Sequence, residues 1–85
     1  MNIELSKDSK KFLKSQNFKI SKRIILRLEK LLENPFPTDM KRVVNVKDKW
    51  FRIRVGDYRI EYAVKAGTIF VFNINKRSRI YDRNK

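Results

Sequence analysis

Two prolines in the stretch Asn34-Pro35-Phe36-Pro37 separate two parts of the chain whose hydrophobic residues repeat with different periods. The residue before a proline disfavours helical backbone, so a helix must end near Asn34. Beyond the prolines, apolar and polar residues alternate, as they do in half-buried strands. Ahead of them, apolar residues recur at helical spacing, at Ile20, Ile24, Ile25, Leu28, Leu31 and Leu32. The chain must therefore combine helices with a sheet, which predicts an α+β fold.

Capping residues and turn signals set the expected elements. A short strand over residues 2–5 precedes a helix that Ser6 can cap and that runs to about Gln16. Asn17 can cap the second, amphipathic helix. Further strands are expected over residues 43–46, 51–55, 58–64 and 68–74, the last as a buried central strand. The predicted order is β-α-α-β-β-β-β: a mostly antiparallel sheet with two N-terminal helices on one face, in a single domain over residues 1–85.

A strong positive charge points to a polyanionic partner. The 85 residues include 22 lysines and arginines against nine acids, a net charge of +13. Each phosphate that such a surface neutralises releases a counterion, so this density favours nucleic acid. A merely solvated basic surface is the alternative. An anionic membrane fits less well, because no basic amphipathic helix exposes bulky apolar residues.

Several chemistries are excluded or disfavoured by residues that the sequence lacks. Without cysteine there is neither a disulfide nor a thiolate metal site. Without histidine the chain lacks the commonest metal ligand and the commonest general base near neutral pH. No apolar run approaches the roughly 20 residues of a membrane span, and residues 1–4 lack the basic start of a signal peptide. We expect a cytoplasmic protein that works without a cofactor.

The turn at Gly56-Asp57 fixes the register of a hairpin. A two-residue turn with glycine first suits type II′ geometry and places Arg54 opposite Arg59. Side chains alternate across each strand, so one face should pack against the helices. That face carries Phe51, Ile53, Val55, Tyr58, Ile60 and Tyr62, and the other carries Arg52, Arg54, Arg59 and Glu61.

The arginines on this second face favour an anion site. Like charges directly opposite each other destabilise a sheet, so Arg54 facing Arg59 suggests that the charges are held for a ligand. A guanidinium group grips phosphate oxygens through a planar fork, which suits an RNA phosphate or its transition state. The alternative is a solvated face on which Glu61 simply pairs with Arg52.

The stretch Phe51-Arg52-Ile53-Arg54-Val55-Gly56-Asp57-Tyr58-Arg59-Ile60-Glu61-Tyr62 resembles the RelE/ParE superfamily of toxins. The Asn-Pro-Phe-Pro segment after an amphipathic helix and the basic ending Lys76-Arg77-Ser78-Arg79-Ile80-Tyr81-Asp82-Arg83 fit the same pattern in the same order. The resemblance covers essentially the whole chain. It implies the RelE-like fold, a RelB-like antitoxin partner and, for the RelE branch, cleavage of mRNA in the ribosomal A site. The alternatives are a ParE-like gyrase inhibitor, and a nucleic-acid-binding module or inactive toxin.

The resemblance also implies roles for five residues. Arg52 and Arg54 match two basic residues on a strand that faces RNA, and Arg59 matches the arginine that holds the scissile phosphate. Arg77 matches a basic residue that stabilises charge. Tyr81 matches an aromatic that stacks on a nucleobase, although it could equally pin the tail to the sheet.

Two departures from the family pattern affect the chemistry. Better-known RelE enzymes carry lysines where this chain has Arg52 and Arg54, and arginine cannot readily take up a proton. The arginines can therefore bind the phosphate, whereas no residue is identified as the general base. Glu61 replaces a residue that is usually apolar. We expect Glu61 to be a structural counterion of Arg52, with a weak base as the alternative.

Overall fold

The computed structural model describes residues 1–42 and 50–76. In chain order the elements are β1 (Asn2–Leu5), α1 (Lys7–Ser15), α2 (Phe18–Glu33), β2 (Lys41–Arg42), β3 (Trp50–Val55), β4 (Tyr58–Lys65) and β5 (Thr68–Lys76). They form one five-stranded sheet in the order β1-β5-β4-β3-β2, in which β1 runs parallel to β5 and the other neighbours are antiparallel. The predicted α+β fold and element order are confirmed.

Both predicted helix caps are present. The Oγ atom of Ser6 accepts a hydrogen bond from the Ser9 backbone N–H at 3.1 Å, and Oδ1 of Asn17 accepts one from Ile20 at 3.0 Å. Each cap satisfies a backbone donor that the first helical turn leaves without an intrahelical partner. Ser6 Oγ also lies 2.8 Å from the Phe72 carbonyl, to which it can donate. The start of α1 is thereby fixed to β5.

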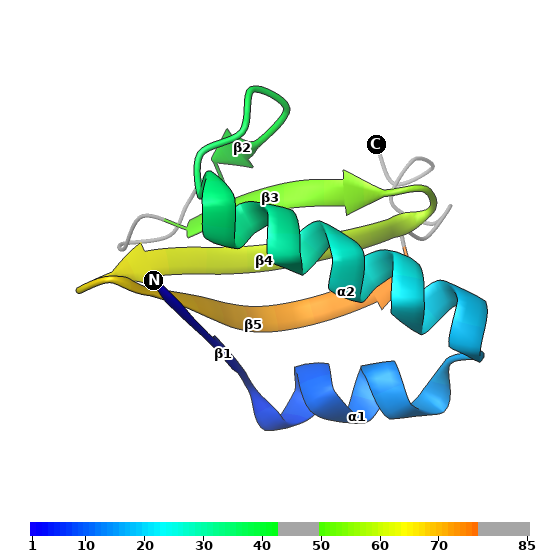
Figure 1. Cartoon of the computed structure of the whole chain (residues 1–85). Coiled ribbons are helices and arrows are strands. Elements are labelled where there is room, and N and C mark those ends of the chain that lie inside the picture. The colour runs from blue at the N-terminus through cyan, green and yellow to red at the C-terminus, as the bar shows by residue number, and fades with distance from the viewer. Residues whose placement is uncertain (43–49, 77–85) are drawn as a thin grey trace, which may run out of the picture.

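The helices cover one face of the sheet. Figure 1 shows α2 crossing the strands while α1 lies below it, near β1 and β5. Phe12 of α1 packs edge-on against Tyr58, with 5.8 Å between ring centroids. The buried core unites α2 with the three longest strands, through Ile24, Leu28, Leu31, Ile53, Ile60, Tyr62, Ile69, Val71 and Ile74. The alternation of the hairpin predicted three of these residues, Ile53, Ile60 and Tyr62.

The hairpin of β3 and β4 has the predicted register, with Arg54 paired to Arg59 and Ile53 to Ile60. Gly56 has a φ of +59°, the positive value that the first position of a type II′ turn requires. A Cβ atom at Gly56 would lie 2.7 Å from Nη2 of Arg23, so a larger residue would have to displace the end of that side chain as well as adopt a strained backbone angle.

Two features of the sheet differ from the prediction. The described part of β2 is Lys41–Arg42, ahead of the predicted strand at 43–46, which lies outside the described residues. Pairing can begin at Lys41 because the Met40 N–H donates to the Pro37 carbonyl and closes the preceding turn. The second feature is a β-bulge, since Glu61 pairs with Asn73 but Tyr62 pairs with Val71, which leaves Phe72 as an extra residue.

Tyr62 joins the sheet to the loop after α2. Its buried hydroxyl donates to the Pro35 carbonyl at 2.8 Å. Burial raises the pKa of the Tyr62 phenol from 10.0 to about 12, because the charged form would lose its hydration. Nearby, Nη2 of Arg27 donates to both carboxylate oxygens of Asp39, at 2.6 and 2.7 Å. These contacts set the path of the chain from α2 into β2.

Candidate functional site

The face of the sheet turned away from the helices carries the candidate site. Its basic part, which we call the arginine face, consists of Arg52 and Arg54 on β3 and Arg59 on β4. The Arg54 side chain is exposed, whereas Arg52 and Arg59 are half-buried. The prediction that these three residues share one face of the sheet is confirmed, although their side chains differ in solvent exposure.

Glu61 belongs to the same face, and its ion-pair partner differs from the expected one. Its Oε2 atom lies 3.8 Å from Nε of Arg59, and the two side chains are 17% and 14% exposed. Nδ2 of Asn73 also donates to Oε1 of Glu61 at 3.4 Å. Arg59 stands two residues before Glu61 on β4 and faces Arg54 across the hairpin, so the carboxylate offsets the repulsion at the more crowded arginine. Glu61 lies opposite Arg52 in the sheet as predicted, but the prediction that Glu61 forms an ion pair with Arg52 is wrong.

Arg52 and Arg54 form no ion pair within the described part of the chain. Their positive charge is thus available to an anion. The ion pair with Glu61 holds a third guanidinium group, that of Arg59, beside them. Because guanidinium groups pair with phosphate oxygens through directed N–H donors, this face can bind a nucleic-acid backbone.

Aromatic residues beside the arginines were missed by the sequence reasoning. Trp50, two residues before Arg52 on β3, stacks on Phe72 with 4.5 Å between ring centroids and 25° between ring planes. Alternation along β3 could have placed Trp50 on this face. Alternation with the buried Ile69 and Val71 could likewise have placed Phe72 on this face, whereas the position of Asn73 after the bulge could not be assigned.

Two predicted site residues, Arg77 and Tyr81, lie outside the described residues. Within residues 1–42 and 50–76, no three acidic side chains are grouped so that they could hold a metal ion. None of the helices in that part of the chain is long and apolar enough to cross a membrane.

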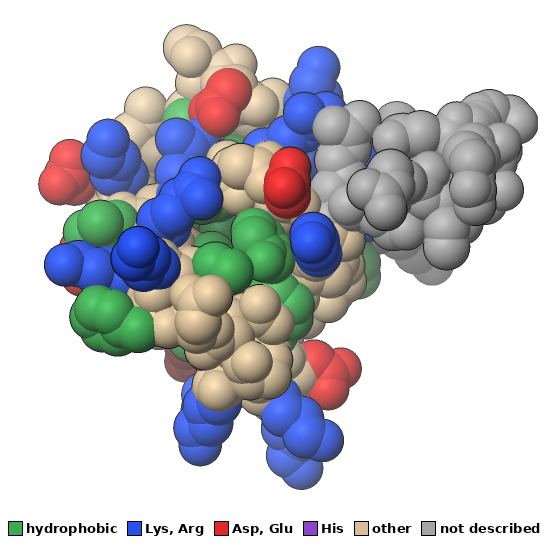
Figure 2. Space-filling model, turned by 90° about the vertical axis from the view of Figure 1, so that its right-hand side faces the viewer, with side chains coloured by type: hydrophobic (Ala, Val, Ile, Leu, Met, Phe, Trp, Pro, Cys, Tyr) green, Lys and Arg blue, Asp and Glu red, His purple; other side chains and the backbone are tan. Residues whose placement is uncertain are grey.

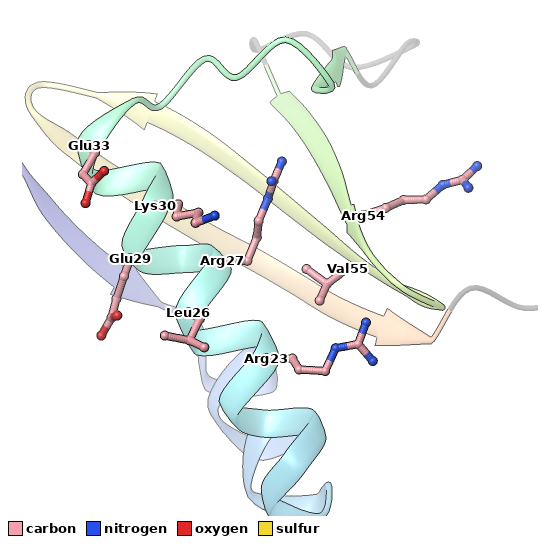
Figure 3. A pocket seen from close by; sticks show the side chains of 8 residues that line it. All are labelled: Arg23, Leu26, Arg27, Glu29, Lys30, Glu33, Arg54 and Val55. Carbon is pink, nitrogen blue, oxygen red and sulfur yellow. The ribbon is translucent and has the colours of Figure 1, made fainter.

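A groove of about 560 Å³ borders the arginine face, between α2 and β3. Figure 3 shows Arg23, Arg27 and Lys30 leaving α2 on the side of β3, while Glu29 and Glu33 leave on the other side. Leu26, Arg54 and Val55 complete the lining. Arg54 therefore belongs both to the groove and to the arginine face. Figure 2, which looks at the hairpin end of the molecule, shows lysine and arginine side chains spread around apolar ones.

The fold is similar to that of several solved toxins. A chain in the crystal structure of the archaeal RelE–RelB complex from Pyrococcus horikoshii OT3 is 25% identical, with a TM-score of 0.79, and the match covers 92% of this chain and 96% of that one. For the RelB–RelE complex from Methanococcus jannaschii the identity is 32% and the TM-score 0.68, over 95% and 98% of the chains. The isolated E. coli RelE toxin is 19% identical and has a TM-score of 0.76, and the match covers 98% of this chain and 93% of that one. It shares the fold.

Sequence comparison places the chain in a family. No curated protein sequence gives a significant match. A family model described as "ParE toxin of type II toxin-antitoxin system, parDE" matches residues 3–81. This match covers most of the chain, including the hairpin that carries the arginine face. The chain therefore belongs to the ParE toxin family of type II toxin–antitoxin systems, within the RelE/ParE superfamily whose motifs it carries.

Proposed function

We propose that this chain is a RelE-type toxin of the cytoplasm that cleaves mRNA in the ribosomal A site and works without a metal ion. The observation that carries the proposal is the arginine face, where Arg54 lies directly opposite Arg59 and next to Arg52. Like charges directly opposite each other destabilise a sheet, so this arrangement is useful only if an anionic ligand binds there. The bound anion would be the scissile phosphate and its neighbours.

The proposed reaction is attack by the 2′-hydroxyl on the adjacent phosphorus. The O2′–P bond forms, the P–O5′ bond breaks, the proton of the 2′-hydroxyl is removed and the departing 5′ oxygen is protonated. Arg59, held by Glu61 at 3.8 Å, would grip the phosphate while negative charge grows on its oxygens. Arg54 and Arg52 would stabilise the same charge from β3.

Proton removal is the weaker half of this chemistry. Arginine remains charged at neutral pH, so Arg52 and Arg54 are poor bases. The Glu61 carboxylate is engaged by Arg59 and Asn73, which favours a positioning role. Alignment of the 2′-hydroxyl with the phosphate by the ribosome would then supply much of the rate. By resemblance, Arg77 and Tyr81 would add charge stabilisation and base stacking.

The proposed partner is a RelB-like antitoxin. Similar structures from Pyrococcus horikoshii and Methanococcus jannaschii are complexes with RelB. The α2–β3 groove, with basic side chains on its β3 side and Leu26 and Val55 in its lining, would suit an acidic amphipathic segment of such a partner. A segment seated there would contact Arg54 and so compete with RNA.

A cleavage assay on programmed ribosomes tests the proposal. Purified chain should cut mRNA at the A-site codon, mapped by primer extension, and should cut the same mRNA far more slowly without ribosomes. Equal cleavage of free and ribosome-bound mRNA would contradict the mechanism.

The second candidate function is inhibition of DNA gyrase, favoured by the match to the ParE family model. Inhibition of gyrase does not require the arginine face to catalyse a reaction. Loss of gyrase supercoiling, with mRNA in programmed ribosomes left intact, would replace the nuclease proposal with this one.

A further inference from the structure

The stacked pair of Trp50 and Phe72 extends the candidate site beyond the arginines. Both side chains are half-buried, so part of the pair remains open to solvent. Their ring centroids are 4.5 Å apart, and their nearly parallel planes make a layered apolar surface at one end of the arginine face. We call this pair the aromatic platform.

The β-bulge brings Asn73 onto the same face as the platform. In a regular strand, Phe72 and Asn73 would point to opposite faces of the sheet. Here Asn73 bonds Glu61 and Phe72 stacks on Trp50, so both side chains lie on the face away from the helices. Bulges re-aim side chains in this way and are over-represented near functional sites.

Trp50 also continues the line of Arg52 and Arg54 along β3. Residues two apart on a strand share a face and are separated by about 7 Å. An extended single strand that lies along β3 could therefore place successive phosphates near Arg54 and Arg52 and a base near Trp50. Stacking on aromatic rings beside a basic track is the usual way in which proteins hold unpaired nucleotides.

We propose that the aromatic platform stacks an unpaired nucleobase of RNA whose backbone lies over Arg52 and Arg54. The choice of mRNA as the natural ligand rests on the proposed function. RNA is favoured over a peptide because these two arginines have no ion-pair partner within the described residues and lie in line with Trp50.

Trp50 is the single tryptophan of the sequence, so its fluorescence reports on the platform directly. The chain, at 85 residues, can be made by chemical synthesis. The probe is a short single-stranded 2′-O-methyl RNA of mixed sequence, which cannot be cut by 2′-hydroxyl attack. An abasic strand of equal length, with the same phosphates, is the reference. The RNA should quench Trp50 and bind about 5- to 150-fold more tightly than the abasic strand, since a stacked base contributes about 1–3 kcal/mol.

Substitutions assign the effect to the platform. Trp50→Leu should abolish most of the preference for the base-containing strand, measured by anisotropy of labelled RNA, whereas Trp50→Phe should retain it. Phe72→Leu should weaken the preference. Phe18→Leu is the matched control, because Phe18 is an aromatic of α2 that is 76% exposed. Thermal melting identifies any variant that fails to fold, and if Trp50→Leu is one of them, Phe72→Leu decides the question.

The platform would be overturned by a lack of RNA binding, by equal binding and quenching by both strands, or by a loss of preference no greater in Trp50→Leu than in Phe18→Leu. A change of Trp50 fluorescence with a co-purified partner protein, but not with RNA, would assign the pair to a protein interface and also overturn it. If RNA quenches Trp50 but programmed ribosomes are not cleaved, the proposed function fails and the platform stands. If ribosomes are cleaved but RNA does not quench Trp50, the platform fails and the proposed function stands.

Discussion

Replacement of Tyr62 by phenylalanine should make the chain less stable at neutral pH but less sensitive to alkali. The Tyr62 side chain is fully buried and its hydroxyl donates to the Pro35 carbonyl at 2.8 Å. Tyr62→Phe removes this donor and leaves the carbonyl without it. The lost hydrogen bond and the unsatisfied acceptor together should cost about 1–3 kcal/mol at pH 7.

The alkaline behaviour follows from the raised pKa of Tyr62, about 12 against 10.0 for an unfolded tyrosine. Between these values the unfolded chain has lost the phenolic proton and the folded chain keeps it, so stability falls as pH rises. The contribution is fully present below pH 10 and decreases by about 1.4 kcal/mol for each pH unit up to about pH 12. All other side chains are the same in both proteins, so their effect cancels in the difference.

Urea unfolding followed by circular dichroism from pH 7 to pH 12 measures this difference. The free energies of unfolding of the wild type and Tyr62→Phe should converge above pH 10. Tyr58→Phe is the control, because Tyr58 also lies on the helix-covered face and packs against Phe12. Two curves that stay parallel up to pH 12 would refute the buried hydrogen bond and its linkage to ionisation.

Other predictions separate the core, the turns and the arginine face. Ile60→Ala should destabilise the chain by about 2–5 kcal/mol in urea unfolding by opening a core cavity, whereas Arg54→Ala should change stability by less than about 0.5 kcal/mol. Ala66→Asn should raise the melting temperature by a few degrees, because Ala66 has a φ of +50° and asparagine tolerates left-handed backbone better; an unchanged melting temperature would count against strain there. Glu61→Gln should slow cleavage less than tenfold if Glu61 only positions Arg59, and a loss of a hundredfold or more with unchanged melting would make Glu61 the base.

Local rules allowed much of the fold to be predicted. The two-residue turn at Gly56-Asp57 fixed the pairing of Arg54 with Arg59, and alternation then assigned Ile60 to the core. The caps at Ser6 and Asn17 were predictable because serine and asparagine side chains bond the free donors of a first helical turn.

Features that depend on packing between distant strands were not predictable. Glu61 had arginines of two strands within reach, and only the assembled sheet set its pairing with Arg59. The bulge at Phe72 is invisible in the sequence because Phe70-Val71-Phe72-Asn73-Ile74 is compatible with more than one register. The stack of Trp50 on Phe72 joins β3 to β5 across β4, so it depends on the strand order and could not be foreseen either.

Single-turnover cleavage of mRNA in the A site of programmed ribosomes, compared between the wild type and Arg59→Ala, tests the central claim most directly. Arg59→Ala should be about 10²- to 10³-fold slower, as expected when a donor to a developing phosphate charge is removed. Arg42→Ala, which removes an exposed arginine of β2 outside the arginine face, should cleave within a few-fold of the wild type. Thermal melting should verify that Arg59→Ala is folded. Equal rates for Arg59→Ala and the wild type would contradict the assignment of the arginine face as the catalytic surface.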